Sequence, residues 1–599
     1  MSRTAPASDA SLRRTREQEP VSSHASYKAI DLTIIAAIVI FAAIAMARSG
    51  SRRGFELMPW PDGVEYAAQA VNIDSGLGPV LHFGGYSYPS RYTEGYPLIL
   101  AAAWPLVGHD VAWLFLATTA LGLVAVAALY ILTLWLFGRP SAVFAAIILA
   151  LSPVFLTYST LVLSDVPTLA VTILAALALR TAASREHGER YSAGLSAWAL
   201  FGLLAGLSAM MRPTNATILA GLLLGLALVP PRRFRTLALA LAGFGAAFLV
   251  PIAAQMYENA IHLGSPFASG YSWWVPEVYG RGGHTFSAAY LFGATMPRNP
   301  RGNLTVYVAA LLGLDGLLVN RGDLRFFLYP FAAAAFAVIG VGATFRDQSS
   351  QSTRRVVLFG VGYLAALLAL YSVYMFTDVA FILPGTFILF AGAGYGVVIA
   401  NRRMRSSFGD VKRGAIASAI GAGVIALDLL LAVSLLSAAR ARFTANPAPS
   451  AMVPALETLN HSLPPDAVVV TNVSLQFFGL YVSAAGRDLI ALNYLDPGER
   501  FTDYHLHRLF DKRASGWVGA IPAALFDGET MSKSVVGSID AALAAHKLVT
   551  LVLARPESPD YADTLKHQLD ALHGRYDVES AGGNQVIAVF QLSERASGK

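Results

Sequence analysis

Two carboxylates follow the first hydrophobic segment at a spacing that suits acid–base chemistry. Asp62 and Glu65 lie in Pro61-Asp-Gly-Val-Glu-Tyr66, and on a helix a spacing of three places both side chains on one face. A carboxylate at a membrane surface can take a proton from a hydroxyl acceptor. We therefore predict Asp62 as a general base supported by Glu65. The competing interpretation is a solvated loop in which Asp62 caps a helix.

A third acid, Asp165, stands in Leu163-Ser-Asp-Val-Pro167, at the predicted outer start of a hydrophobic span. Ser-Asp before Pro is also an ordinary helix-start pattern. The two interpretations are compatible, because a capping aspartate is held rigidly and can still orient a neighbour. We group Asp165 with the catalytic candidates.

Two arginines on the predicted outer face supply positive charge. Arg212 lies between two spans with almost no loop, and Arg91 lies in Ser90-Arg-Tyr-Thr-Glu94. An arginine pinned at a membrane surface needs an anion, and a lipid phosphate is the nearest plentiful one. We predict that both bind the phosphate of a lipid. Alternatives are snorkelling toward lipid headgroups and, for Arg91, an ion pair with Glu94.

Aromatic residues gather in the second large outer loop, at Tyr271, Trp273 and Trp274. Such a cluster suits either a belt at headgroup level or a surface on which a sugar stacks. We expect no metal site. His505 and His507 would share a face on a strand, but the local pattern favours a helix. The chain has no cysteine, which excludes disulfides and thiolate chemistry.

Composition indicates a membrane protein. The chain has 599 residues, of which 55% are hydrophobic and only 14% charged, whereas soluble domains are about a quarter charged. The net charge of +6 comes from basic residues scattered over loops between apolar runs. That distribution is expected of membrane loops and gives no reason to expect a nucleic-acid partner.

About eleven transmembrane helices are predicted. Loops rich in Lys and Arg face the cytoplasm. An odd number of spans satisfies this rule, with the N-terminal tail inside and the C-terminal tail outside. We interpret 301–320 as interfacial and the first span as a retained anchor. Glycines 202, 206, 221, 225 and 392–396 are assigned to helix packing. The spans are 30–47, 111–137, 141–157, 164–182, 195–211, 214–230, 236–256, 326–345, 356–376, 379–400 and 414–438.

The predicted fold is an α-helical polytopic membrane domain with a soluble α/β domain after it. Residues 1–29 form a cytoplasmic tail and 30–440 the membrane domain, with outer loops 48–110 and 257–325. Residues 447–599 form the extracytoplasmic α/β domain. Its expected strands and helices are Ala467–Thr471, Asp488–Asn493, Leu548–Leu553, Gln585–Gln591, Ile539–His546 and Tyr561–Leu572.

The membrane region resembles the GT-C-type integral-membrane glycosyltransferases. These include the protein O-mannosyltransferases and the bacterial aminoarabinose lipid A transferases. The motifs that carry the resemblance are Asp62-Gly-Val-Glu-Tyr66, Glu94-Gly-Tyr-Pro97, Ser164-Asp-Val-Pro167, Arg212-Pro213, Gly264–Tyr271 and Asp378-Val-Ala-Phe-Ile-Leu-Pro384.

The resemblance implies a polyprenyl-phosphate sugar donor and a glycan, lipid or protein acceptor. It implies transfer at the outer face of a bacterial inner membrane, in cell-envelope glycan biosynthesis. We expect the transfer to invert the anomeric centre, because a single displacement needs one base carboxylate, and to need no divalent metal, because arginine can do the work of the ion. It also adds Asp378 to the substrate loop. One position departs from the family, because Ala380 stands where a basic residue often precedes the aromatic-Leu-Leu-Pro element. Arg212 or Arg91 must then contact the phosphate.

Two other functions remain open at this stage. A lipid or sugar transporter would carry charges at mid-membrane and repeated halves, but the acids gather at one face and no repeat is evident. A non-catalytic envelope-assembly scaffold would tolerate the loss of Asp62.

Overall fold

The computed structural model describes most of the membrane region and parts of the C-terminal region. The described residues are 21–50, 62–83, 86–185, 191–231, 234–274, 279, 285–293, 301–314, 328–329, 331–346, 349–408, 419, 423, 426, 430, 458–471, 488–491, 528–554, 566, 569–570, 572–583 and 587–595.

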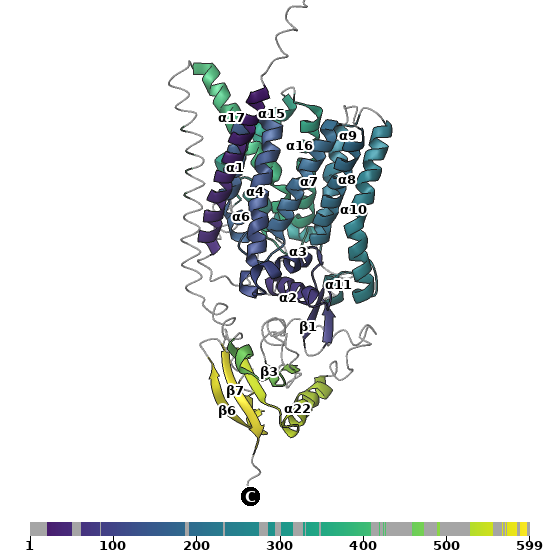
Figure 1. Cartoon of the computed structure of the whole chain (residues 1–599), viewed down its shortest axis with the longest axis vertical. Helices are drawn as coiled ribbons and strands as arrows, with labels where there is room; N and C mark the ends of the chain where they lie inside the picture. The colour runs from purple at the N-terminus through teal and green to yellow at the C-terminus, as the bar shows by residue number, and fades with distance from the viewer. Residues whose placement is uncertain are drawn as a thin grey trace, which may run out of the picture.

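Long apolar helices run side by side along one axis and form a bundle (Figure 1). Six described helices are long and apolar enough to cross a membrane, or seven if one bent pair counts as a span. The predicted total of eleven stays a prediction, because 414–438 lies almost wholly outside the described residues. The bundle helices are α1 (Val21–Gly50), α4 (Phe115–Phe137), α5 (Arg139–Leu151), α7 (Asp165–Arg185), α8 (Tyr191–Met211), α9 (Ile218–Leu228), α10 (Phe234–Leu263), α15 (Phe331–Arg346), α16 (Gln351–Ser372) and α17 (Phe387–Phe408).

Glycines let the bundle helices approach closely. A Cβ on Gly202 of α8 would lie 2.1 Å from the backbone oxygen of Phe244 on α10. A Cβ on Gly396 of α17 would lie 2.0 Å from the backbone oxygen of Phe336 on α15. Small residues are the usual means of bringing membrane helices together. The predicted packing role of these glycines is confirmed.

Several predicted spans are interrupted near one end of the bundle. Pro153 separates α5 from the short α6 (Pro153–Tyr158), and the 3-10 helix η4 (Pro213–Thr217) precedes α9. The 3-10 helix η7 (Val379–Gly385) meets α17 at an angle of 68°. Proline removes a backbone donor and disrupts a regular helix. The breaks leave turns and helix ends, rather than continuous helix, at this end of the molecule.

The first outer loop is folded. It contains α2 (Asp62–Asp74), the antiparallel pair β1 (Val80–Phe83) and β2 (Tyr86–Pro89), and α3 (Gly95–Ala103). The second loop begins later than predicted, because α10 continues to Leu263, and it contains α11 (Gly270–Trp274). α13 (Asn303–Leu311) is too short to span a bilayer, which needs about 20 helical residues. Figure 1 shows α2, α3, β1 and α11 together at the same end of the bundle.

The C-terminal region contains a mixed five-stranded sheet with the order β4-β3-β5-β7-β6. β3 pairs in parallel with β4 and β5, while β7 pairs antiparallel with β5 and β6. The four predicted strands are present, and β6 is additional. This sheet lies beyond the end of the bundle that carries α2 (Figure 1). The elements are β3 (Val468–Thr471), β4 (Asp488–Ala491), α22 (Gly528–Ala544), β5 (Val549–Ala554), β6 (Tyr576–Gly583) and β7 (Ile587–Glu594).

Candidate active site

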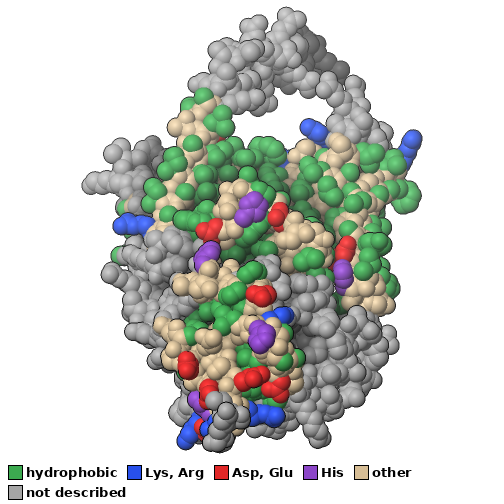
Figure 2. All heavy atoms as spheres, turned by 60° about the horizontal axis from the view of Figure 1, so that its bottom comes forward, with side chains coloured by type: hydrophobic (Ala, Val, Ile, Leu, Met, Phe, Trp, Pro, Cys, Tyr) green, Lys and Arg blue, Asp and Glu red, His purple; other side chains and the backbone are tan. Residues whose placement is uncertain are grey.

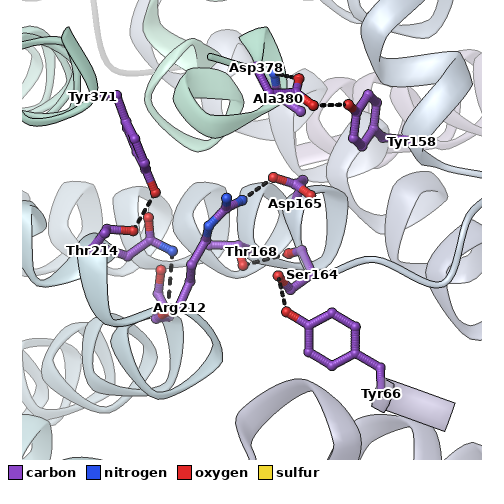
Figure 3. A network of polar contacts seen from close by, with 12 residues as sticks. Tyr66, Tyr158, Ser164, Asp165, Thr168, Arg212, Thr214, Tyr371, Asp378 and Ala380 are labelled. Carbon is purple, nitrogen blue, oxygen red and sulfur yellow. Dashed lines mark hydrogen bonds and ion pairs between the residues drawn. The ribbon is translucent and has the colours of Figure 1, made fainter. Parts of the chain in front are cut away.

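A hydrogen bond joins helix α2 to the residue that precedes α7, and this contact brings the residues of the site together. Asp62 and Glu65 both lie in the first turn of α2. The next residue, Tyr66, is buried, and its hydroxyl lies 3.2 Å from Ser164 Oγ (Figure 3). Ser164 immediately precedes Asp165, the first residue of α7. The three predicted catalytic acids therefore come from two elements that are in direct contact.

Glu65 is fully buried and holds Arg91. Its Oε1 lies 2.8 Å from Arg91 Nε, and its Oε2 accepts a hydrogen bond of 3.3 Å from Ser90 Oγ. Gln69 Nε2 donates to the same Ser90 oxygen over 2.7 Å. A buried charge of this kind needs a paired and hydrogen-bonded partner. The sequence also suggested that Arg91 pairs with Glu94. In the structure Arg91 pairs with Glu65 instead, because the first turn of α2 packs against Arg91.

Asp62 is partly exposed and accepts a hydrogen bond on Oδ1 from the hydroxyl of Tyr92. Burial raises the pKa of Asp62 above its ordinary value, while Arg91 and the Tyr92 hydroxyl oppose that rise. Burial of a carboxyl favours its neutral form, whereas nearby positive charge and donated hydrogen bonds favour the anion. A raised pKa in a reachable carboxylate is what a general base requires.

Arg212 forms the second carboxylate–arginine pair. Its Nη1 donates to Asp165 Oδ1, so a carboxylate of the protein pairs with Arg212, whereas the sequence led us to expect a lipid phosphate (Figure 3). The guanidinium carbon lies 4.7 Å from the ring centroid of Phe381 and 5.9 Å from that of Tyr371. Arg212 keeps 17% of its side chain exposed. A small part of the Arg212 side chain is thus open to solvent, with its guanidinium beside Phe381.

Asp378 lies on the far side of this group, directly before η7. Its Oδ1 accepts a hydrogen bond of 2.9 Å from the backbone N–H of Ala380, and its Oδ2 accepts one from the hydroxyl of Tyr158 (Figure 3). Asp378 thus caps η7 and fixes the turn that carries Phe381. The predicted substrate residue has a clear structural task within the site.

The substrate loop reaches the site through Tyr271 on α11. Its ring centroid lies 5.5 Å from that of Tyr92, in an edge-on arrangement. The helix can come this close because Gly270 has no side chain, and a Cβ there would lie 1.9 Å from the backbone oxygen of Ser90. The side chains of Trp273 and Trp274 lie outside the described residues, as do His505 and His507.

Several polar residues of the site carry no signal in the sequence. Tyr92, Tyr158 and Tyr371 are single tyrosines without a motif, and their partners lie far away in the chain.

Glu94 is buried, and burial raises its pKa to about 8. In the described part of the chain its Oε2 has no hydrogen-bond partner.

Figure 2 shows acidic and histidine side chains at several separate places on this face of the molecule, among hydrophobic and other surface. Among the described residues, no three of the His, Asp and Glu side chains are placed to hold a metal ion together. Positive charge at the centre of this site comes from Arg91 and Arg212.

Sequence comparison finds a family match within the membrane region. Residues 95–257 match the sequence model of the family described as dolichyl-phosphate-mannose-protein mannosyltransferase. This stretch contains Asp165, Arg212 and most of the bundle. No curated protein matches the chain. The family match bears out the sequence prediction of a glycosyltransferase of the GT-C type.

Solved structures share the fold at low sequence identity. ArnT from Cupriavidus metallidurans bound to undecaprenyl phosphate aligns with a TM-score of 0.58 and 11% identity, covering 93% of this chain and 98% of that one. The Archaeoglobus fulgidus oligosaccharyltransferase in complex with Zn and sulfate aligns with a TM-score of 0.52 and 14% identity, covering 93% and 73%. The predicted GT-C-like fold is confirmed.

Proposed function

We propose that the protein moves a sugar from a polyprenyl-phosphate donor to a hydroxyl acceptor, with Asp62 as general base. The observation that carries this proposal is the grouping of a partly exposed Asp62 with Arg91 and Arg212 at the end of a GT-C-type bundle. A base and a cationic phosphate site on the same face are the parts that a single displacement needs.

The reaction is a single inverting displacement at the anomeric carbon. The acceptor hydroxyl gives its proton to Asp62 as its oxygen bonds to the anomeric carbon. The bond between that carbon and the phosphate oxygen breaks, and its electron pair leaves with the phosphate. Arg212 stabilises the charge that develops on the phosphate, because its guanidinium lies beside Phe381 and its side chain is not wholly buried.

Arg212 also supplies the positive charge that is missing at Ala380. The family often has a basic residue there, but in this chain the arginine beside the following Phe381 comes from the end of α8. A cation is thus present next to the aromatic residue, although it is supplied by a different element. This supports Arg212, ahead of Arg91, as the donor phosphate contact.

A lipid experiment tests the donor class. Protein purified in mild detergent should carry a polyprenyl phosphate, with or without one sugar, that organic extraction and mass spectrometry identify. Purified Arg212→Ala protein should carry much less of it, while the amount of ordinary phospholipid stays unchanged. Equal polyprenyl phosphate on both proteins would remove Arg212 as its contact, and none on either after reconstitution with it would contradict the proposed donor.

We further propose that the C-terminal sheet lies outside the cytoplasm, on the same side as Asp62. Asp165 begins α7 and Arg185 ends it, which agrees with basic residues facing the cytoplasm. The chain has no cysteine, so a single introduced cysteine reports one side. Ser593→Cys on the exposed part of β7 should react with an impermeant maleimide in intact cells. Gln351→Cys at the start of α16 should react only after permeabilisation, and the reverse pattern would overturn the topology.

A further inference from the structure

The hydroxyl of Tyr92 occupies one oxygen of the Asp62 carboxylate and leaves the other open. Tyr92 donates to Asp62 Oδ1. In the described part of the chain, Oδ2 makes no hydrogen bond. Both side chains are partly exposed, so a substrate can approach the carboxylate from the open side. The two oxygens of Asp62 are therefore inequivalent before any acceptor arrives.

Tyr92 is held by the protein independently of Asp62. Its ring centroid lies 4.5 Å from that of Tyr66 on one side and 5.5 Å from that of Tyr271 on another. The following residue is fixed as well, because Thr93 Oγ1 donates to the backbone oxygen of Met211 over 3.2 Å. A donor fixed by its surroundings orients its acceptor without a further ordering cost.

The charges that face Asp62 oppose one another. Burial and the carboxylates of Glu65 and Asp165 raise the pKa of Asp62, whereas Arg91 and the Tyr92 hydroxyl lower it. Arg91 is already paired with Glu65. The Tyr92 hydroxyl is the direct hydrogen-bond donor to the Asp62 carboxylate, and it favours the anion because a donated hydrogen bond is stronger to the charged form.

We propose that Tyr92 is a positioning residue for the base: its hydroxyl fixes Asp62 through Oδ1, so that Asp62 stays ionised and Oδ2 receives the acceptor proton. This inference rests on the proposed role of Asp62. It assigns a task to a tyrosine that touches the base and does not itself exchange the transferred proton.

Tyr92→Phe separates this role from ring packing, because the ring contacts remain and only the hydroxyl is lost. The acidic limb of the kcat/KM profile should move to higher pH by about one unit, since a hydrogen bond to a charged group contributes enough to shift a pKa by that amount. We expect kcat at the optimum to fall about tenfold and the KM for the lipid donor to stay unchanged.

Tyr96→Phe is the matched control. Tyr96 also packs against Tyr66, at 5.0 Å between ring centroids, but its hydroxyl bonds to Thr118 over 2.6 Å. It should leave the acidic limb in place. A second test replaces Tyr92 with 3-fluorotyrosine, whose more acidic hydroxyl is a stronger donor. The acidic limb should then move to lower pH, and this variant serves if Tyr92→Phe does not fold.

The outcomes separate this inference from the proposed function. An inactive Asp62→Asn together with an unshifted limb in the folded Tyr92 variants would overturn the role of Tyr92 and keep Asp62 as base. An active Asp62→Asn would overturn both. An equal limb shift in Tyr92→Phe and Tyr96→Phe would assign the effect to general loosening around Tyr66, and would also overturn the role of Tyr92.

Discussion

Asp62→Asn should keep the fold and lower sugar transfer by roughly 10²–10⁴-fold, the usual contribution of a general base. The change is isosteric, and the amide still accepts the Tyr92 hydrogen bond that Asp62 Oδ1 receives. It cannot take up the acceptor proton near neutral pH. The assay follows radiolabelled sugar leaving the polyprenyl-phosphate fraction of membranes that contain the protein. Donor binding should be little changed.

The matched control for this variant lies on the same helix. Asp74→Asn makes the same chemical change at the last residue of α2, where the carboxylate lies 3.9 Å from His109 Nε2. It should transfer sugar like the wild type. Transfer by Asp62→Asn within about tenfold of wild type would remove Asp62 as the base, because general bases contribute more than that. The base would then have to be another group of the site.

Arg212→Ala should weaken donor binding by about 10–100-fold, since a hydrogen bond to a charged group contributes about 1.5–3 kcal/mol. Arg212→Lys should recover part of the loss, because a lysine keeps the charge but lacks the planar fork. Donor affinity is measured by titrating reconstituted protein with polyprenyl phosphate. The acceptor KM should change much less.

Arg212→Ala also removes the ion-pair partner of Asp165. Controls must separate this effect from the loss of a contact to the donor phosphate. Arg212→Ala combined with Asp165→Asn removes the stranded charge and should bind the donor as poorly as Arg212→Ala alone. Arg139→Ala breaks another pair, in which Arg139 Nε lies 2.5 Å from Asp31 Oδ1 near the other end of α4, and should leave donor binding intact. Recovery of binding in the double variant would mean that Arg212 only neutralises Asp165.

The membrane architecture was predictable where one physical signal dominates. A bilayer demands long apolar segments, and α4, α7, α8, α10 and α16 lie where hydropathy places them. The break at Pro153, inside the predicted span 141–157, was not foreseen, because hydropathy does not register a change of helix direction. The folded outer loop also escaped prediction, since α2 is amphipathic and short.

The site was predictable in its charged residues and not in their pairing. Asp62, Asp165 and Arg212 stand out because they lie next to apolar spans, and a charged side chain in the apolar part of a membrane is costly. Their partners depend on which loop residues the bundle brings together, and Arg91 meets Glu65 across 26 positions of sequence. Tyr92 has no local signature, since a single tyrosine beside a span resembles an ordinary interfacial residue.

The contact at Gly270 also limits how this protein can diverge. An ideal Cβ at Gly270 would lie 1.9 Å from Ser90 O and 2.7 Å from Arg91 Cα. Any larger residue would push α11 away from the strand end that precedes Arg91. A related protein with another side chain in place of Tyr271 could act on a different substrate and still keep the contact between Gly270 and Ser90. Replacing Gly270 would require changes in both outer loops at the same time. Related sequences should therefore vary at position 271 and keep glycine at position 270.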